Sequence, residues 1–221
     1  MVLRIAHCII LDHIVRNKSM RKSDKLVCGI GVKGNLYQTT ENGKKIPVYS
    51  LWINMLLRST KEHWVKYPSY TNTACSENFK SYTYFYEWCQ QQVGFGNKDE
   101  KGKSWCLDKD LLVKSNRVYG ENTCCFVPHR INMLVSLCCG NRGKYPIGVS
   151  WNKYVSKFCV QVGVGGGKNR YLGRFNTPQE AFKAYKTYKE TLIKQVANEY
   201  KEQLDSRVYE ALMNYEVNEN D

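Results

Sequence analysis

Three side chains with oxygen donors form the first candidate site for chemistry in this chain. Asp108 and Asp110 stand two residues apart, and Asn132 follows on a predicted helix. A strand carboxylate and a helix carboxamide can meet at one divalent cation, and hard oxygen ligands in a basic surround suit phosphodiester hydrolysis. By spacing alone, two carboxylates exposed on a turn are commoner than a metal site. Whether these three side chains can share one cation therefore depends on the strands and helices that position them.

A cationic stretch near the end of the chain is the second candidate site. Residues 142–179 hold seven cations and no carboxylate, in a chain with 33 Lys and Arg, 20 Asp and Glu and a formal net charge of +13. Such a surplus indicates a polyanionic partner. The alternative is a basic face that is only solvated. The seven cations are Arg142, Lys144, Lys153, Lys157, Lys168, Arg170 and Arg174.

The oxygen donors lie on a predicted unit of strand, loop, strand and helix. Residues 107–111 and 124–127 read as two short strands around a polar connection. Pro128 follows, and residues 129–137 carry apolar side chains at helical spacing. This order predicts that Asp108 lies on a strand and Asn132 on the helix that packs against it.

Two aromatic segments precede this unit. Residues 48–59 have an apolar face at helical spacing and predict an amphipathic helix. Phe79, Tyr82, Phe85 and Trp88 recur at three-residue steps, which predicts a second helix buried on one side. A surface for stacking nucleic-acid bases is the alternative, but regular spacing is more typical of a core.

The cationic stretch reads as a sheet packed on a helix. Residues 148–151, 157–162 and 170–175 predict three short strands, and residues 177–180 form a capping box with Pro178 at the first helical position. The apolar pattern then continues to Leu212, too long for so small a sheet to cover. We expect the far end of this helix to pack elsewhere, with a homodimer as one arrangement.

Composition and the positions of the cysteines indicate which class of protein this chain belongs to. A hydrophobic fraction of 43% over 221 residues supports folded cores, and no apolar run is long enough for a transmembrane helix. The apolar residues 5–11 lack the features of a signal peptide, so a cytoplasmic protein with reduced cysteines is expected. The pairs Cys124-Cys125 and Cys138-Cys139 are adjacent, and no C-x-x-C pair occurs, so we expect no structural zinc.

A set of motif residues runs through roughly residues 47 to 137, namely residues 75–79, 82, 85, 88, 107–110, 116, 119, 123–124, 126–128 and 132. In order and spacing these residues resemble the phage-encoded HNH (His-Me finger) homing-type endonucleases. The resemblance implies one Mg²⁺ or Mn²⁺ ion held by Asp108 and Asn132, with Asp110 nearby. Lys109 stands where the family has its general-base histidine, and an ordinary lysine is protonated at neutral pH; His129 is a substitute base.

A second set of motif residues comprises residues 147–153, 157–158, 161, 170–175, 177–178, 180–181 and 184–185. Over residues 145–197 they resemble the Apetala-type DNA-binding domain of plant ethylene-response factors and phage HNH proteins. It implies that the sheet enters the major groove of double-stranded DNA, with the helix packed behind. Phe158 replaces the family's strand-two tryptophan, which removes an indole donor. The expected DNA-binding residues are Trp151, Lys153, Lys157, Gln161, Lys168, Arg170 and Arg174.

Together these features predict an α+β protein in three parts. They are a basic lead-in over residues 1–46, an HNH-like ββα-metal module over 47–140, and an Apetala-type domain with an extended C-terminal helix over 145–221. The first hypothesis is a metal-dependent DNA endonuclease or nickase in a host cytoplasm. The second is a DNA-binding protein without catalysis, which Lys109 favours. A third is a phage protein that blocks a host defence or replication factor.

Overall fold

The computed structural model describes residues 25–136, 143–165 and 167–221. Predictions for residues 1–24, for the Cys138-Cys139 pair and for Arg142 fall outside these described residues. The fold is α+β, as predicted, and the chain divides into two compact units. The first comprises residues 1–91 and 117–121, and the second comprises residues 92–116 and 122–221. Among the described residues, no helix is both long and apolar enough to cross a membrane.

The first unit consists of short helices around an aromatic core, with two small two-stranded sheets. One sheet is an antiparallel hairpin of β1 and β2, and the other pairs β3 with β5 in parallel. The elements are β1 (Thr40–Glu41), β2 (Lys44–Lys45), α2 (Pro47–Arg58), α3 (Lys61–Lys66), η2 (Pro68–Tyr70), β3 (Ala74–Cys75), η3 (Asn78–Lys80), α4 (Tyr82–Gln90) and β5 (Val118–Tyr119).

The aromatic core confirms the predicted helix over residues 48–59 and, in the second aromatic segment, the buried face; Phe79 lies on η3, however, and the helix α4 begins only at Tyr82. Trp52 on α2 is fully buried and donates its Nε1–H to the carbonyl of Phe79 at 2.8 Å. Helix α4 begins after Ser81, whose hydroxyl accepts the N–H of Tyr84. Phe79, Tyr82 and Phe85 are 0% exposed, so these rings form the core and offer no stacking surface for bases.

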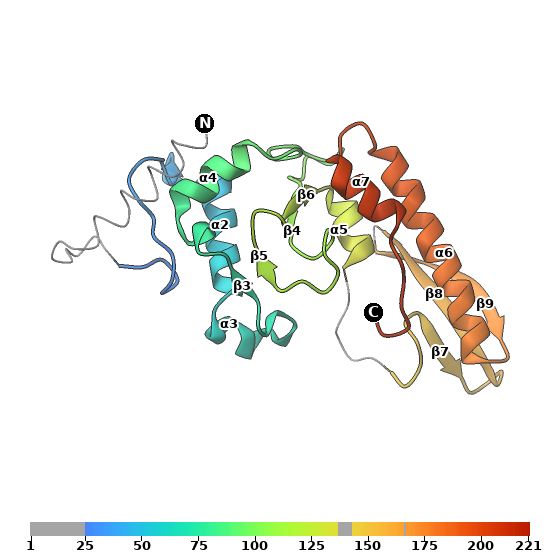
Figure 1. Cartoon of the computed structure of the whole chain (residues 1–221). Coiled ribbons are helices and arrows are strands. Elements are labelled where there is room, and N and C mark those ends of the chain that lie inside the picture. The colour runs from blue at the N-terminus through green and yellow to red at the C-terminus, as the bar shows by residue number, and fades with distance from the viewer. Residues whose placement is uncertain (1–24, 137–142, 166) are drawn as a thin grey trace. The chain divides into compact units, whose positions relative to one another are not determined.

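The second unit contains a two-stranded sheet followed by a helix, and then a three-stranded sheet packed on a long helix. Strands β4 and β6 pair antiparallel, and the larger sheet has the antiparallel order β7-β8-β9 (Figure 1). Its elements are β4 (Cys106–Asp108), β6 (Cys125–Val127), α5 (His129–Val135), β7 (Val149–Asn152), β8 (Lys157–Gly165), β9 (Lys168–Phe175), α6 (Pro178–Glu199) and α7 (Ser206–Met213).

Helix α6 covers one face of the three-stranded sheet. The predicted capping box is present: Thr177 accepts the N–H of Glu180, and the Glu180 carboxylate accepts the N–H of Thr177. Val160 and Val162 on β8 pack against Ala181 and Tyr185 of the helix. Gly148 allows this approach, because a Cβ there would lie 2.0 Å from the Tyr185 ring.

The prediction of one continuous C-terminal helix was wrong. Helix α6 ends at Glu199, the chain turns, and α7 begins after Asp205, whose carboxylate accepts the N–H of Arg207 at 2.8 Å. Helix α7 contacts α6, which buries Val208 and Leu212 within the same chain. The apolar face that suggested a homodimer is therefore covered, although dimerisation itself stays a prediction.

Candidate functional site

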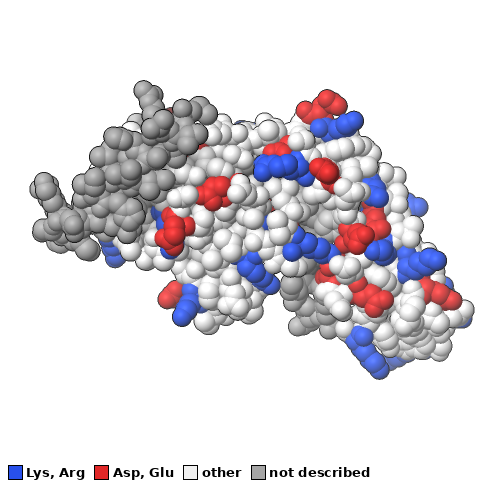
Figure 2. Space-filling view, viewed as in Figure 1, with Lys and Arg blue, Asp and Glu red and all other residues white. Residues whose placement is uncertain are grey.

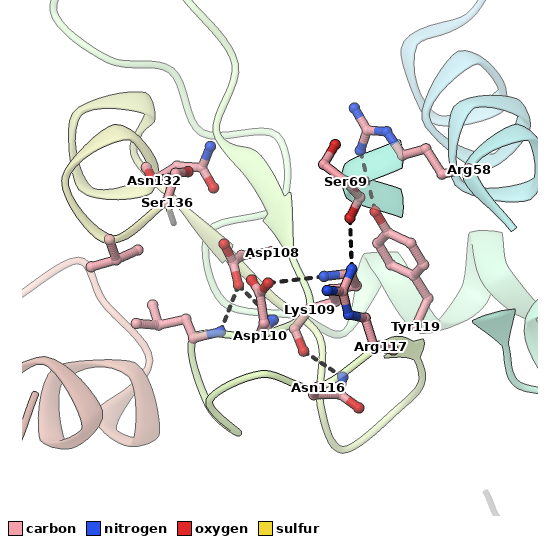
Figure 3. Close-up of polar contacts among 12 residues, drawn as sticks. Arg58, Ser69, Asp108, Lys109, Asp110, Asn116, Arg117, Tyr119, Asn132 and Ser136 are labelled. Atoms are coloured by element: carbon pink, nitrogen blue, oxygen red, sulfur yellow. Dashed lines mark hydrogen bonds and ion pairs between the residues drawn. The ribbon is translucent and has the colours of Figure 1, made fainter. Parts of the chain in front are cut away.

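Asp108 ends strand β4 and is enclosed by the turn that follows it. It pairs with Cys125 of β6 and is 7% exposed. Its Oδ1 accepts two backbone N–H groups, from Asp110 at 2.9 Å and from Leu111 at 2.7 Å (Figure 3). The turn thus fixes one carboxylate oxygen, which pre-organises the side chain.

Lys109 and Asp110 form a pair beside this carboxylate. The Lys109 Nζ donates to Asp110 Oδ2 at 2.9 Å, and the Asn116 carboxamide donates to the carbonyl of Lys109 at 2.6 Å. The Asp110 side chain is 43% exposed, whereas that of Lys109 is 11% exposed. Lys109, which was predicted to replace a general-base histidine, therefore contacts the second carboxylate of the turn.

Burial and the neighbouring negative charge make ionisation of the Asp108 carboxyl group unfavourable. Burial raises the pKa of Asp108 from its ordinary value of 3.8 to about 6, and the negative charge of Asp110 raises it too, while the two N–H donors lower it. A divalent cation would relieve this cost, because it favours the ionised form of both carboxylates.

Asn132 and His129 lie on α5, the helix that contacts β4. In Figure 3 the Asn132 and Asp108 side chains project into the space between these two elements. His129 takes a different partner: its Nδ1 lies 3.6 Å from the Sγ of Cys106, two residues before Asp108 on β4. The structure thus places Asp108 and Asp110 on one turn and Asn132 on the neighbouring helix α5, and it turns His129 toward Cys106 at the start of the strand.

This donor set fits a hard divalent cation. Two carboxylates and one carboxamide supply oxygen ligands of the kind that Mg²⁺ and Mn²⁺ prefer. Within the described part of the chain, no three His, Cys, Asp or Glu side chains form a metal-binding group by themselves. A cation at Asp108 would therefore depend on Asn132 as well as on the carboxylates.

The outer face of the three-stranded sheet, opposite α6, is a second polar region. Cross-strand pairing places Ser150 and Arg174 on either side of Cys159, and Gln161 beside Tyr171. These residues line a hollow of about 510 Å³. The complete lining is Ser150, Trp151, Asn152, Lys153, Tyr154, Cys159, Gln161, Tyr171 and Arg174.

A bulge in β9 decides which arginine reaches this face. Arg174 pairs with Cys159 and Tyr171 pairs with Gln161, and the register shifts between these two pairs at Gly173, whose φ is +136°. Arg170 consequently pairs with the buried Val162, and its guanidinium lies over the Tyr188 ring of α6 at 5.7 Å. Of the two arginines expected to bind DNA from this strand, Arg174 lines the hollow, whereas the placement of Arg170 on the free face of the sheet is corrected.

The other predicted DNA-binding residues occupy different parts of the sheet. Lys153 lies in the β7–β8 turn, 5.2 Å from the Tyr154 ring, while Lys157 donates to the Asn176 side chain. Lys168 pairs with Gly165 at the far end of the sheet. Trp151 lines the hollow, and its ring lies 4.8 Å from that of Phe158.

Tyr171 is the exposed residue that sequence reasoning missed. It is 49% exposed and lines the hollow next to Gln161. A glycine inside a strand is a common sign of a bulge, so Gly173 was the available signal.

The charge of the outer face differs from that of the helical face. The hollow is lined by the cations Lys153 and Arg174 and by no carboxylate. In the view of Figure 2, acidic and basic side chains are interspersed over the helices α6 and α7. Carboxylates thus accompany the cations over these helices, whereas none lines the hollow on the sheet.

Comparison with protein-family models, with curated proteins and with solved structures found no match. The resemblances to HNH endonucleases and to the Apetala-type domain stay predictions. Two arrangements in the described residues could bind a ligand: the Asp108–Asp110 turn beside helix α5, and the hollow on β7, β8 and β9, which no carboxylate lines.

Proposed function

We propose that this protein binds double-stranded DNA through the outer face of the sheet β7-β8-β9. The observation that carries the proposal is a sheet with one face packed on α6 and the other lined by polar side chains and cations without a carboxylate. The major groove admits β-strands, and phosphates attract the surrounding cations. A face that was only solvated would have no need to exclude acidic residues.

Two side chains on this face are suited to reading base edges. Arginine can bond guanine O6 and N7 in a bidentate manner, and glutamine can do the same with adenine N6 and N7. Arg174 and Gln161 therefore take these roles, with Lys153 in the turn neutralising a phosphate. Tyr171 adds an exposed ring for apolar contact with a base.

The matched pair Arg174→Ala and Arg170→Ala tests this assignment in the full-length protein. Both changes remove one positive charge from β9, but only Arg174 lines the outer face. Loss of a base contact costs about 1–3 kcal/mol, so duplex affinity should fall roughly 5- to 150-fold in Arg174→Ala and much less in Arg170→Ala. Fluorescence anisotropy with labelled duplex measures both; equal losses would contradict the assignment.

A specific observation favours hydrolysis as a second function. Asp108 is a buried carboxylate with a raised pKa beside Asp110, an arrangement that a folded protein keeps at a cost to stability. We propose that Asp108, Asp110 and Asn132 hold one divalent cation for nicking of DNA. A bound Mg²⁺ or Mn²⁺ ion supplies charge neutralisation and an acidified water.

Nicking of supercoiled plasmid tests this second function. Wild-type protein should nick in the presence of Mg²⁺ or Mn²⁺ and not with chelator, and Asp108→Asn should remove the activity. Lys109→His, which places an imidazole base beside Asp108, should raise the rate. Cleavage that persists in Asp108→Asn would belong to a contaminant, and no cleavage by wild type leaves DNA binding as the function.

A further inference from the structure

A small exposed segment of the first unit, formed by α3 and η2, has no part in a core. Neither α3 nor η2 buries a side chain. Val65 is 87% exposed and Tyr67 is 44% exposed. Because a short helix gains most of its stability from packing of an apolar face, this segment must be held by other contacts.

Cations and aromatic rings supply those contacts. The Arg58 guanidinium lies 5.3 Å from the centre of the Tyr70 ring, and the Lys66 Nζ lies 5.4 Å from that of Tyr67. The His63 ring lies between the two tyrosines, at 4.7 Å from Tyr67 and 5.3 Å from Tyr70. The segment is therefore an ordered array of rings and cations at the surface.

A further arginine extends this array. Arg117 donates from Nη1 to the carbonyl of Ser69 at 2.6 Å, and Arg58 donates to the Tyr119 hydroxyl at 3.3 Å, so both guanidinium groups are held in place (Figure 3). Residues 58–70 contain one acidic residue, Glu62. The surface is thus strongly cationic, and its charges are positioned by backbone and ring contacts.

We propose that this cation–aromatic surface, made of Arg58, Lys66, Tyr67, Tyr70 and Arg117, binds single-stranded nucleic acid. Proteins that bind single strands combine cations that follow the backbone with rings on which bases stack. A duplex keeps its base faces stacked inside, so the exposed ring of Tyr67 and the half-buried ring of Tyr70 favour an unpaired strand. The surface lies in the first unit and is separate from the proposed duplex-binding sheet of the second.

Anisotropy of a labelled, unstructured oligothymidylate with the full-length protein tests the proposal. Loss of one stacked base contact costs about 1–3 kcal/mol, so Tyr67→Ala should weaken binding roughly 5- to 150-fold. Lys66→Ala should weaken it and lessen its salt dependence, whereas Glu62→Gln should tighten it. Duplex binding should change little in Tyr67→Ala, whose exposed ring can be removed without disturbing a core.

Arg174→Ala is the matched control, because it alters the sheet and leaves this surface intact. Oligothymidylate binding that weakens in Arg174→Ala and not in Tyr67→Ala would assign single strands to the sheet and overturn the proposal. Absence of oligothymidylate binding, or displacement by polyglutamate as effective as by oligothymidylate, would also overturn it. If the protein binds oligothymidylate through Tyr67 but does not bind duplex, the proposed function of the sheet is refuted. The single-strand site on the cation–aromatic surface would then still be supported.

Discussion

At the scale of single residues, Asp108 and Arg174 owe their positions to backbone features that side-chain types alone do not reveal. The Asp108 carboxylate is held by two N–H groups of its own turn, and Arg174 faces outward because of the bulge at Gly173. The sequence predicted both residues as candidates, since carboxylate and cation clusters are visible in it. It misplaced Arg170, because alternation cannot locate a bulge.

The stability of metal-free protein should depend on pH through Asp108. Folding raises its pKa to about 6, so its contribution to stability is fully present below the unfolded value near 3.8 and is lost as pH rises through 6. Asparagine keeps an oxygen for the two N–H donors and carries no charge. Asp108→Asn should therefore be more stable than wild type at neutral pH, by on the order of 1–3 kcal/mol.

Urea unfolding in the presence of chelator, followed from acid to neutral pH, measures this difference. The two proteins should have similar stability near about pH 4, diverge as pH rises from about 4 to 6, and keep a constant difference at higher pH. Equal stability at neutral pH would show that the fold imposes no electrostatic cost on Asp108.

At the scale of elements, the C-terminal helices show that apolar periodicity predicts helical structure but does not locate a break between two helices. Thr177 and Glu180 correctly predict the start of α6, because the side chains of a capping box accept backbone N–H groups at the N-terminus of a helix. The apolar period runs on through Leu204 to Leu212, although the chain turns between Glu199 and Ser206. Asp205 was the one local sign of a new helix start.

Leu212→Ala should destabilise the folded protein substantially. Leu212 is 1% exposed, and removal of a buried leucine side chain costs about 2–5 kcal/mol. Glu210→Ala, an exposed change on the same helix, is the control and should have little effect. Thermal unfolding measures both, and its midpoint should not vary with protein concentration if α7 packs within its own chain. A midpoint that rises with protein concentration would contradict this and support the homodimer.

At the scale of the whole molecule, the chain forms two compact units, and the first of them is built from two separate segments of the sequence. Residues 117–121 lie between β4 and β6 along the chain, yet β5 pairs with β3 of the first unit. Two-residue strands give no periodic signal, so this pairing could not be predicted. The net charge of +13 predicts a polyanionic partner, and the surfaces proposed in both units carry cations.

The salt dependence of duplex binding, compared between Lys153→Ala and Lys183→Ala, tests the central claim most directly. Each change removes one lysine from the same unit, but Lys153 lines the outer hollow and Lys183 lies on α6, which covers the opposite face. A plot of log affinity against log salt concentration should lose about one unit of slope in Lys153→Ala and keep the wild-type slope in Lys183→Ala. Equal slopes in the two variants, or wild-type affinity that does not fall with salt, would contradict DNA binding through this face.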